Sequence, residues 1–130
     1  MGNGAKGYGG DGGSAGRAGL VEPNGLGLDL GHGTLFIADV SDHRVRAVDL
    51  GSGTMRTVAG TGAAEHSGDG GPAVRADVFG ARAVKVGADG TLYIMERQGS
   101  CAFDVCRDIP EADLGADAIG DGVLAAVPVR

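Results

Sequence analysis

Residues 60–76, GTGAAEHSGDGGPAVRA, repeat a pattern that occurs once before in the chain. Residues 2–18, GNGAKGYGGDGGSAGRA, lie 58 positions earlier and are identical to them at ten of seventeen positions, including the whole GDGG segment. Glycine bias alone does not account for this agreement. Self-similarity at a fixed period of this length is the sequence signature of a repeat architecture.

A second match lies further along both copies. Residues 33–37 read GTLFI and residues 90–94 read GTLYI, at a shift of 57 after a one-residue gap. The chain therefore divides into a first unit (1–60), a second unit (61–107) that diverges after residue 97, and a tail (108–130). The tail lies outside the repeat, and nothing in its sequence requires regular structure.

Each copy predicts short β-strands. Leucine alternates with glycine and aspartate over residues 26–30, which favours a half-buried strand. Residues 34–38 are a continuous apolar run, typical of a strand covered on both faces, and Asp39 ends it. Residues 45–50 and 55–58 predict a third and a fourth strand, with a glycine-rich turn between them.

These motifs together resemble the NHL-repeat family of six-bladed β-propellers. Four segments carry the resemblance: TVAGTG at residues 57–62, HSGDGGPA at 66–73, IAD with DHRVR at 37–46, and Leu20 with Pro23 and Gly25. The similarity runs from residue 2 to about residue 97. It implies an all-β fold, an incomplete β-propeller of about two four-stranded antiparallel blades with glycine-rich inter-blade loops.

The sequence also departs from the family's pattern. Ala81 falls where the first unit has Pro23, and Met95–Arg97 replaces the Ala38–Asp39 pair. The pattern stops after residue 98, so residues 98–130 are a degenerate end, an added segment or the product of a misread frame. Met1 aligns with Ala59 inside a unit, as if the start had cut into a longer protein.

Composition restricts the classes of partner and compartment. A net charge of -6 gives no electrostatic reason to expect nucleic acid or an anionic membrane surface. The sequence contains no signal peptide and no apolar run of about 18 residues, so we expect a cytoplasmic protein as written, although the family is often exported. Cys101 and Cys106 are predicted to be unpaired thiols, with a disulfide as the alternative after export.

The two GDGG loops are the first candidate binding loops. Each contributes one carboxylate, Asp11 or Asp69, that could face a calcium ion, and glycine N–H groups that could face an anion. Calcium takes six to eight oxygen ligands, and one aspartate per loop falls well short. We therefore favour an Asp-Gly turn in which the aspartate satisfies its own backbone.

Asp39, Asp42, His43 and Arg44 form the second candidate site, at the turn between the second and third strands. In a functional interpretation His43 is a base oriented by a carboxylate, and Arg44 binds an anionic substrate. In a structural interpretation the aspartates tie the turn and Arg44 bridges neighbouring blades, as the resemblance implies. We favour the structural interpretation, because the motif recurs in each blade of the family.

The resulting functional hypothesis is a binding scaffold for a protein or small-molecule ligand. We predict no catalytic residue, metal ligand or cofactor, since no nucleophile motif occurs and the three histidines are scattered. One alternative is a fragment of a calcium-dependent propeller enzyme, lactonase- or lyase-like; another is a truncated product without independent function. Two units leave sheet faces uncovered, so we expect either the remainder of a longer chain or a homotrimer that completes six blades.

Overall fold

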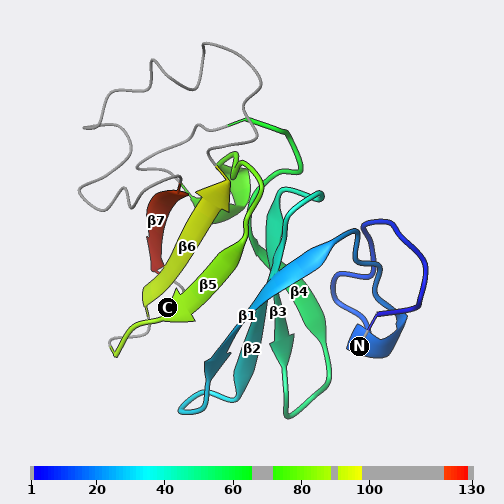
Figure 1. Cartoon of the computed structure of the whole chain (residues 1–130). Helices are drawn as coiled ribbons and strands as arrows, with labels where there is room; N and C mark the ends of the chain where they lie inside the picture. Colours follow the sequence, from blue (N-terminus) through cyan, green and yellow to red (C-terminus); the bar gives the residue numbers. More distant parts are fainter. Residues whose placement is uncertain (1, 66–71, 89–90, 98–121, 129–130) are drawn as a thin grey trace.

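The computed structural model describes residues 2–65, 72–88, 91–97 and 122–128 (Figure 1). In these residues the chain forms two antiparallel sheets and two short 3-10 helices, and no α-helix. The sheet strands, in spatial order, are β1 (Pro23–Asp29), β2 (Thr34–Asp39), β3 (Arg44–Asp49) and β4 (Met55–Ala59), then β5 (Ala83–Val86), β6 (Thr91–Arg97) and β7 (Gly122–Pro128). The predicted all-β class is confirmed; neither sheet is closed, so the propeller stays a prediction.

The repeat is visible as geometry. The 3-10 helices η1 (Ala15–Arg17) and η2 (Ala73–Arg75) begin 58 residues apart. Gly2 donates its N–H to the Ala15 carbonyl at 2.8 Å, and Gly60 donates to the Ala73 carbonyl at 3.0 Å. Both glycines have positive φ, 80° and 92°, a conformation that L side chains rarely adopt. The matched glycines therefore mark the same turn in both units.

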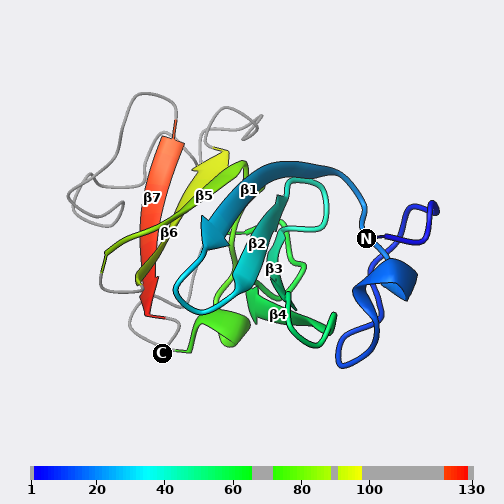
Figure 2. The ribbon, with the colours of Figure 1, turned by 90° about the horizontal axis from the view of Figure 1, so that it is seen from below.

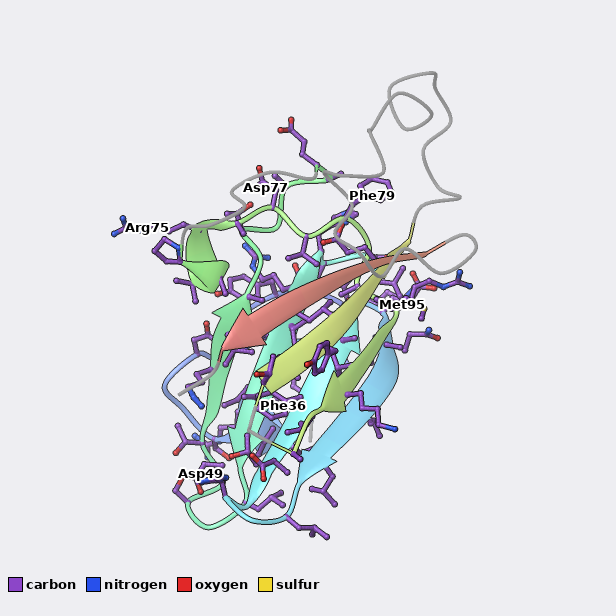
Figure 3. All side chains as sticks on the ribbon, turned by 90° about the vertical axis from the view of Figure 1, so that its left-hand side faces the viewer. Phe36, Asp49, Arg75, Asp77, Phe79 and Met95 are labelled. Carbon is purple, nitrogen blue, oxygen red and sulfur yellow. The ribbon has the colours of Figure 1, made fainter. Side chains whose placement is uncertain are left out.

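Strand β2 is the centre of the first sheet's core, as its apolar run predicted. Phe36 (labelled in Figure 3) and Ala38 point toward the second sheet and pack against its buried side chains. Ile37 points to the other side and packs with Ala15 and Ala18 of the N-terminal segment. Both faces of β2 are therefore covered, which is the environment that its continuous apolar run predicts.

Strand β1 buries the opposite side from the one its leucines suggest. Leu26 and Leu28 are 66% and 49% exposed, whereas Gly25 and Gly27 lie against β5 in the second sheet. A Cβ on Gly25 would meet the Arg82 carbonyl oxygen at 2.5 Å. The predicted alternation of a buried and an exposed face was correct. The glycine face is the buried one, because the backbones of β1 and β5 come into close contact there.

The second sheet draws its third strand from the tail. β7 pairs with β6 over seven residues and occupies, beside β6, the position that β3 occupies beside β2. Regular structure is therefore present at 122–128, where the sequence did not require it. The two sheets pack against each other (Figure 2), and their shared core includes Phe36, Val45, Val84, Leu92 and Ile94.

No helix in the described part of the chain is long and apolar enough to cross a membrane.

Candidate functional site

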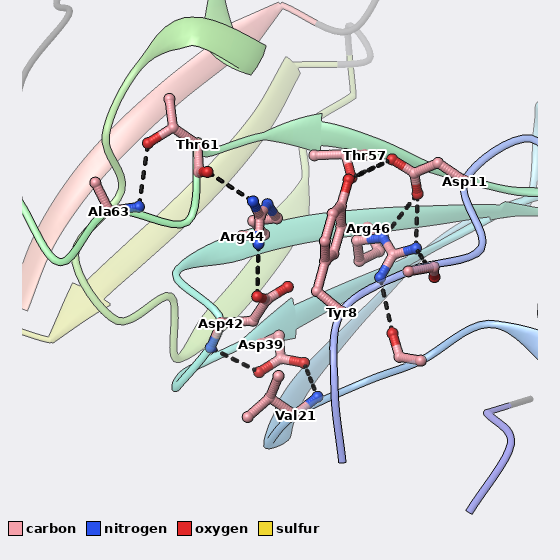
Figure 4. A network of polar contacts seen from close by, with 12 residues as sticks. Tyr8, Asp11, Val21, Asp39, Asp42, Arg44, Arg46, Thr57, Thr61 and Ala63 are labelled. Carbon is pink, nitrogen blue, oxygen red and sulfur yellow. Dashed lines mark hydrogen bonds and ion pairs between the residues drawn. The ribbon is translucent and has the colours of Figure 1, made fainter. Parts of the chain in front are cut away.

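Arg46 is the centre of a polar network on the N-terminal side of the first sheet (Figure 4). This β3 side chain has no exposed surface. Its guanidinium donates to the carbonyls of Gly19 and Gly9 at 3.0 and 2.9 Å, and to Asp11 Oδ1 at 2.6 Å from Nη2 and 3.1 Å from Nε. The planar fork of donors thus binds two segments of the N-terminal loop to the sheet.

Asp11, in the first GDGG loop, does not satisfy its own backbone as predicted, because its carboxylate bonds the side chains of Tyr8, Thr57 and Arg46. Its Oδ2 accepts hydrogen bonds from the hydroxyls of Thr57 at 2.6 Å and Tyr8 at 2.9 Å, and its Oδ1 faces Arg46. Burial acts to raise the pKa of Asp11, but the hydrogen bonds from Thr57, Tyr8 and Arg46 outweigh it and lower that pKa. The aspartate therefore joins the loop to β3 and β4. Asp69, its counterpart, lies outside the described residues.

Tyr8 connects Asp11 to the second candidate cluster. The Arg44 guanidinium lies 3.6 Å from the centre of the Tyr8 ring, and the Arg46 guanidinium lies 4.8 Å from it. Both separations are within the range of attractive cation–π contacts. Sequence reasoning singled out neither Tyr8 nor Arg46. The available signal was an arginine inside the otherwise apolar run VRAV of β3.

Asp39 ties the turn, as the structural interpretation held. This fully buried side chain accepts the N–H of Val21 at 2.7 Å on Oδ2, and the N–H groups of Glu22 and Asp42 at 2.8 and 3.1 Å on Oδ1. Three backbone donors converge on one carboxylate, which holds the entry to β1 beside the exit of β2.

Asp42 and Arg44 form an ion pair at the same turn, with Asp42 Oδ1 2.6 Å from Arg44 Nη1. Burial raises the pKa of Asp42; Arg44 opposes the rise, and the nearby Asp39 adds to it. Arg44 Nη2 also donates to the Thr61 carbonyl at 2.6 Å, at the start of the second unit. The arginine therefore joins the two units through the chain that connects them.

His43 faces the second unit. Its backbone has a φ of 53°, and its Nδ1 accepts the N–H of Gly80 at 2.9 Å. Its ring lies 5.5 Å from that of Phe79, centre to centre. The alternative interpretation of His43, as a base oriented by a carboxylate, gains no support from this contact, because its Nδ1 accepts a backbone N–H.

No group of three or more histidine, cysteine, aspartate or glutamate side chains in the described ranges could hold a metal ion. His66, Cys101 and Cys106 lie outside those ranges.

A depression that sequence reasoning missed lies at the other end of the first sheet. Its volume is about 290 Å³, and its lining comprises Thr34, Asp49, Ser52, Thr54 and Arg56. The backbone N–H groups of Ser52 and Gly51 bind the Asp49 carboxylate and lower its pKa. Asp49 thus orders the turn between β3 and β4.

No protein-family model and no curated protein matches the chain. Solved structures similar to this chain include a structural genomics protein of unknown function from Bacteroides thetaiotaomicron, with a TM-score of 0.57 and 20% sequence identity. The match covers 85% of this chain but 22% of that protein, so this chain spans about a fifth of its length. At this identity the likeness shows a shared fold alone.

Proposed function

We propose that the chain is a pair of NHL-like β-propeller units that acts as a binding scaffold. The observation that carries the proposal is the use of the candidate side chains. All five candidate side chains have partners within the chain: Asp11, Asp39, His43 and Arg44 each bond a loop or strand other than their own, and Asp42 pairs with Arg44. Side chains engaged in this way support a rigid frame, and they are not free to bind or transform a substrate.

The repeated loop turns also support a scaffold. In both copies a glycine turn is bonded to the 3-10 helix, and a pair of antiparallel strands, β1–β2 or β5–β6, follows. The turn, the 3-10 helix and the strands thus recur as a module, while the exposed loop residues between them are free to differ from copy to copy. Ligand recognition in such a protein belongs to those variable positions and to the free sheet faces.

The rival function is a fragment of a calcium-dependent enzyme, and it requires carboxylate oxygens that face a common ion. Both oxygens of Asp11 face Arg46, Thr57 and Tyr8, and both oxygens of Asp39 face backbone N–H groups. A calcium ion would have to displace these donors, at the cost of the contacts that hold the loop.

Calcium and the Asp11→Asn variant separate the two functions. For a scaffold, millimolar calcium leaves the Tm of the wild-type chain unchanged, and Asp11→Asn lowers that Tm with or without calcium. For a calcium site, calcium raises the Tm of the wild-type chain, Asp11→Asn abolishes the rise, and calorimetry shows stoichiometric calcium uptake. That second result would overturn the scaffold proposal. Glu65→Gln, which changes an exposed carboxylate of the other loop, is the matched control.

A further inference from the structure

One face of the first sheet exposes an apolar stripe along β1. Leu26, Leu28 and Leu30 are 66%, 49% and 82% exposed. We call the stripe formed by Leu26 and Leu28, the two that lie within β1, the leucine face. Contiguous exposed apolar surface of this kind marks an interaction site more often than scattered single side chains do.

The repeat says which surface of the second sheet corresponds to the leucine face. Leu26 pairs with Ile37 across the β1–β2 ladder, and Val84 pairs with Ile94 across the β5–β6 ladder. Ile37 and Ile94 are matched positions of the two units. Leu26 therefore corresponds to Val84, and by the same ladders Leu28 corresponds to Val86.

In the second sheet this surface is covered. Val84 is 7% exposed, against 66% for Leu26. The cover is the first sheet, since Gly27 of β1 lies directly against Val84 and Phe36 shares its core cluster. The same face of the repeat is therefore buried in the second sheet and exposed in the first sheet.

The chain also carries a second copy of the covering surface. Gly25, Gly27, Phe36 and Ala38 cover the second sheet, and their ladder counterparts are Ala83, Lys85, Tyr93 and Met95. These four alternate with the buried Val84 and Ile94, so they lie on the outer face of β5–β6. Ala83 and Lys85 are exposed. Because Lys85 replaces Gly27, we expect a contact through this face to be more widely spaced than the internal one.

We infer that the leucine face binds the outer face of β5–β6 of a second copy of this chain, head to tail. The contact repeats between copies the stacking that the two sheets make within one copy. Such an interface is heterologous, so it leaves one free face at each end until a ring closes. The inference rests on the proposed function, because it treats the two sheets as interchangeable units of one scaffold.

A mixing experiment tests the inference by light scattering on a size-exclusion column. The wild-type chain is expected to have at least twice the monomer mass of 12.8 kDa. Leu26→Asp with Leu28→Asp blocks one face, and Ala83→Asp with Lys85→Glu blocks the other. Each double variant alone is expected to be a monomer, and their equimolar mixture is expected to form a 1:1 dimer and nothing larger, because one intact face of each kind remains.

Two results would overturn the inference: a monomeric wild-type chain, or a mixture that stays monomeric although the wild-type chain associates. The second would mean that copies meet through identical faces. All four substituted positions are exposed or half-exposed, and an unchanged far-ultraviolet circular dichroism spectrum verifies that each variant is folded. Leu50→Asp, at an exposed leucine of the β3–β4 turn, is the matched control. Neither result depends on calcium. Failure of this inference can therefore be distinguished from failure of the scaffold proposal, which the calcium experiment tests.

Discussion

Arg46 shows how one residue joins distant parts of this chain. Its side chain is inaccessible to solvent, yet all of its hydrogen-bonding partners come from residues 9–19, at least 27 positions earlier. A buried guanidinium is tolerated when its donors are paired and a carboxylate balances its charge. If Arg46 is removed, the Asp11 carboxylate and the carbonyls of Gly9 and Gly19 lose the hydrogen bonds that it donates.

Replacement of Arg46 by leucine is expected to lower the free energy of unfolding by about 3 kcal/mol, because it removes one partner of a buried ion pair. Urea denaturation monitored by circular dichroism measures the change. Arg56→Leu, at an exposed position of the neighbouring strand, is expected to change it by less than about 0.5 kcal/mol. Equal effects of the two substitutions would contradict the role assigned to Arg46.

Asp11 makes stability depend on acidity. Its pKa in the folded chain is below the ordinary value of 3.8, so the folded state binds the proton less readily than the unfolded state does. The stabilisation is therefore fully present above pH 3.8 and is lost as the pH falls through the lowered pKa. Asp42, whose pKa is raised, has the opposite dependence.

The difference in unfolding free energy between wild type and Asp11→Asn should therefore be largest near neutral pH and should shrink below pH 3.8. Urea titrations at a series of pH values measure this difference. A difference that does not vary between pH 7 and pH 2 would show that the charge of Asp11 is irrelevant to its contacts.

In strand β1, leucine alternates with glycine and aspartate. Its alternation of leucine and glycine specifies which residues share a face, but not which face is buried. The structure buries the glycines, because β5 approaches so closely that even a Cβ on Gly25 would meet backbone atoms. Absence of a side chain is therefore the feature that lets the two sheets stack.

Gly25→Ala is expected to destabilise the chain by about 1–3 kcal/mol, the usual cost of forcing extra volume into a packed contact. Its φ is not positive, so the effect is purely steric. Gly9→Ala is the matched control, since its Cβ would meet nothing within 4 Å and its φ is also not positive. Thermal unfolding of the two variants side by side measures the contrast, and comparable stability would refute the close approach.

At the scale of the whole molecule, association and stability should be coupled. If copies dock through the leucine face, association stabilises the folded state, and the Tm of the wild-type chain rises with protein concentration. The Tm of the Leu26→Asp, Leu28→Asp variant should not change with concentration. Differential scanning fluorimetry over about a hundredfold range of protein concentration measures both Tm values. The same dependence of Tm on concentration in the two proteins would contradict the coupling.

Much of the local structure could be predicted because it depends on local patterns. The duplicated glycine turns, the four strands of the first sheet and the buried run of β2 all lie where periodicity and turn residues place them. The candidate cluster at residues 39–44 is also brought together, since its members are neighbours in sequence. Their role as binding residues stays a prediction.

That the chain is built of two copies of one β-unit follows from the amino-acid sequence alone, because turns and alternation are properties of adjacent residues. Three features depend on tertiary contacts: Arg46 meets Asp11, β1 turns its glycines inward, and residues 122–128 pair with β6 in the second sheet. The physical reason is that burial and long-range pairing depend on which surfaces approach one another. An alternation of residue types along a strand does not specify which other strand or loop will pack against it.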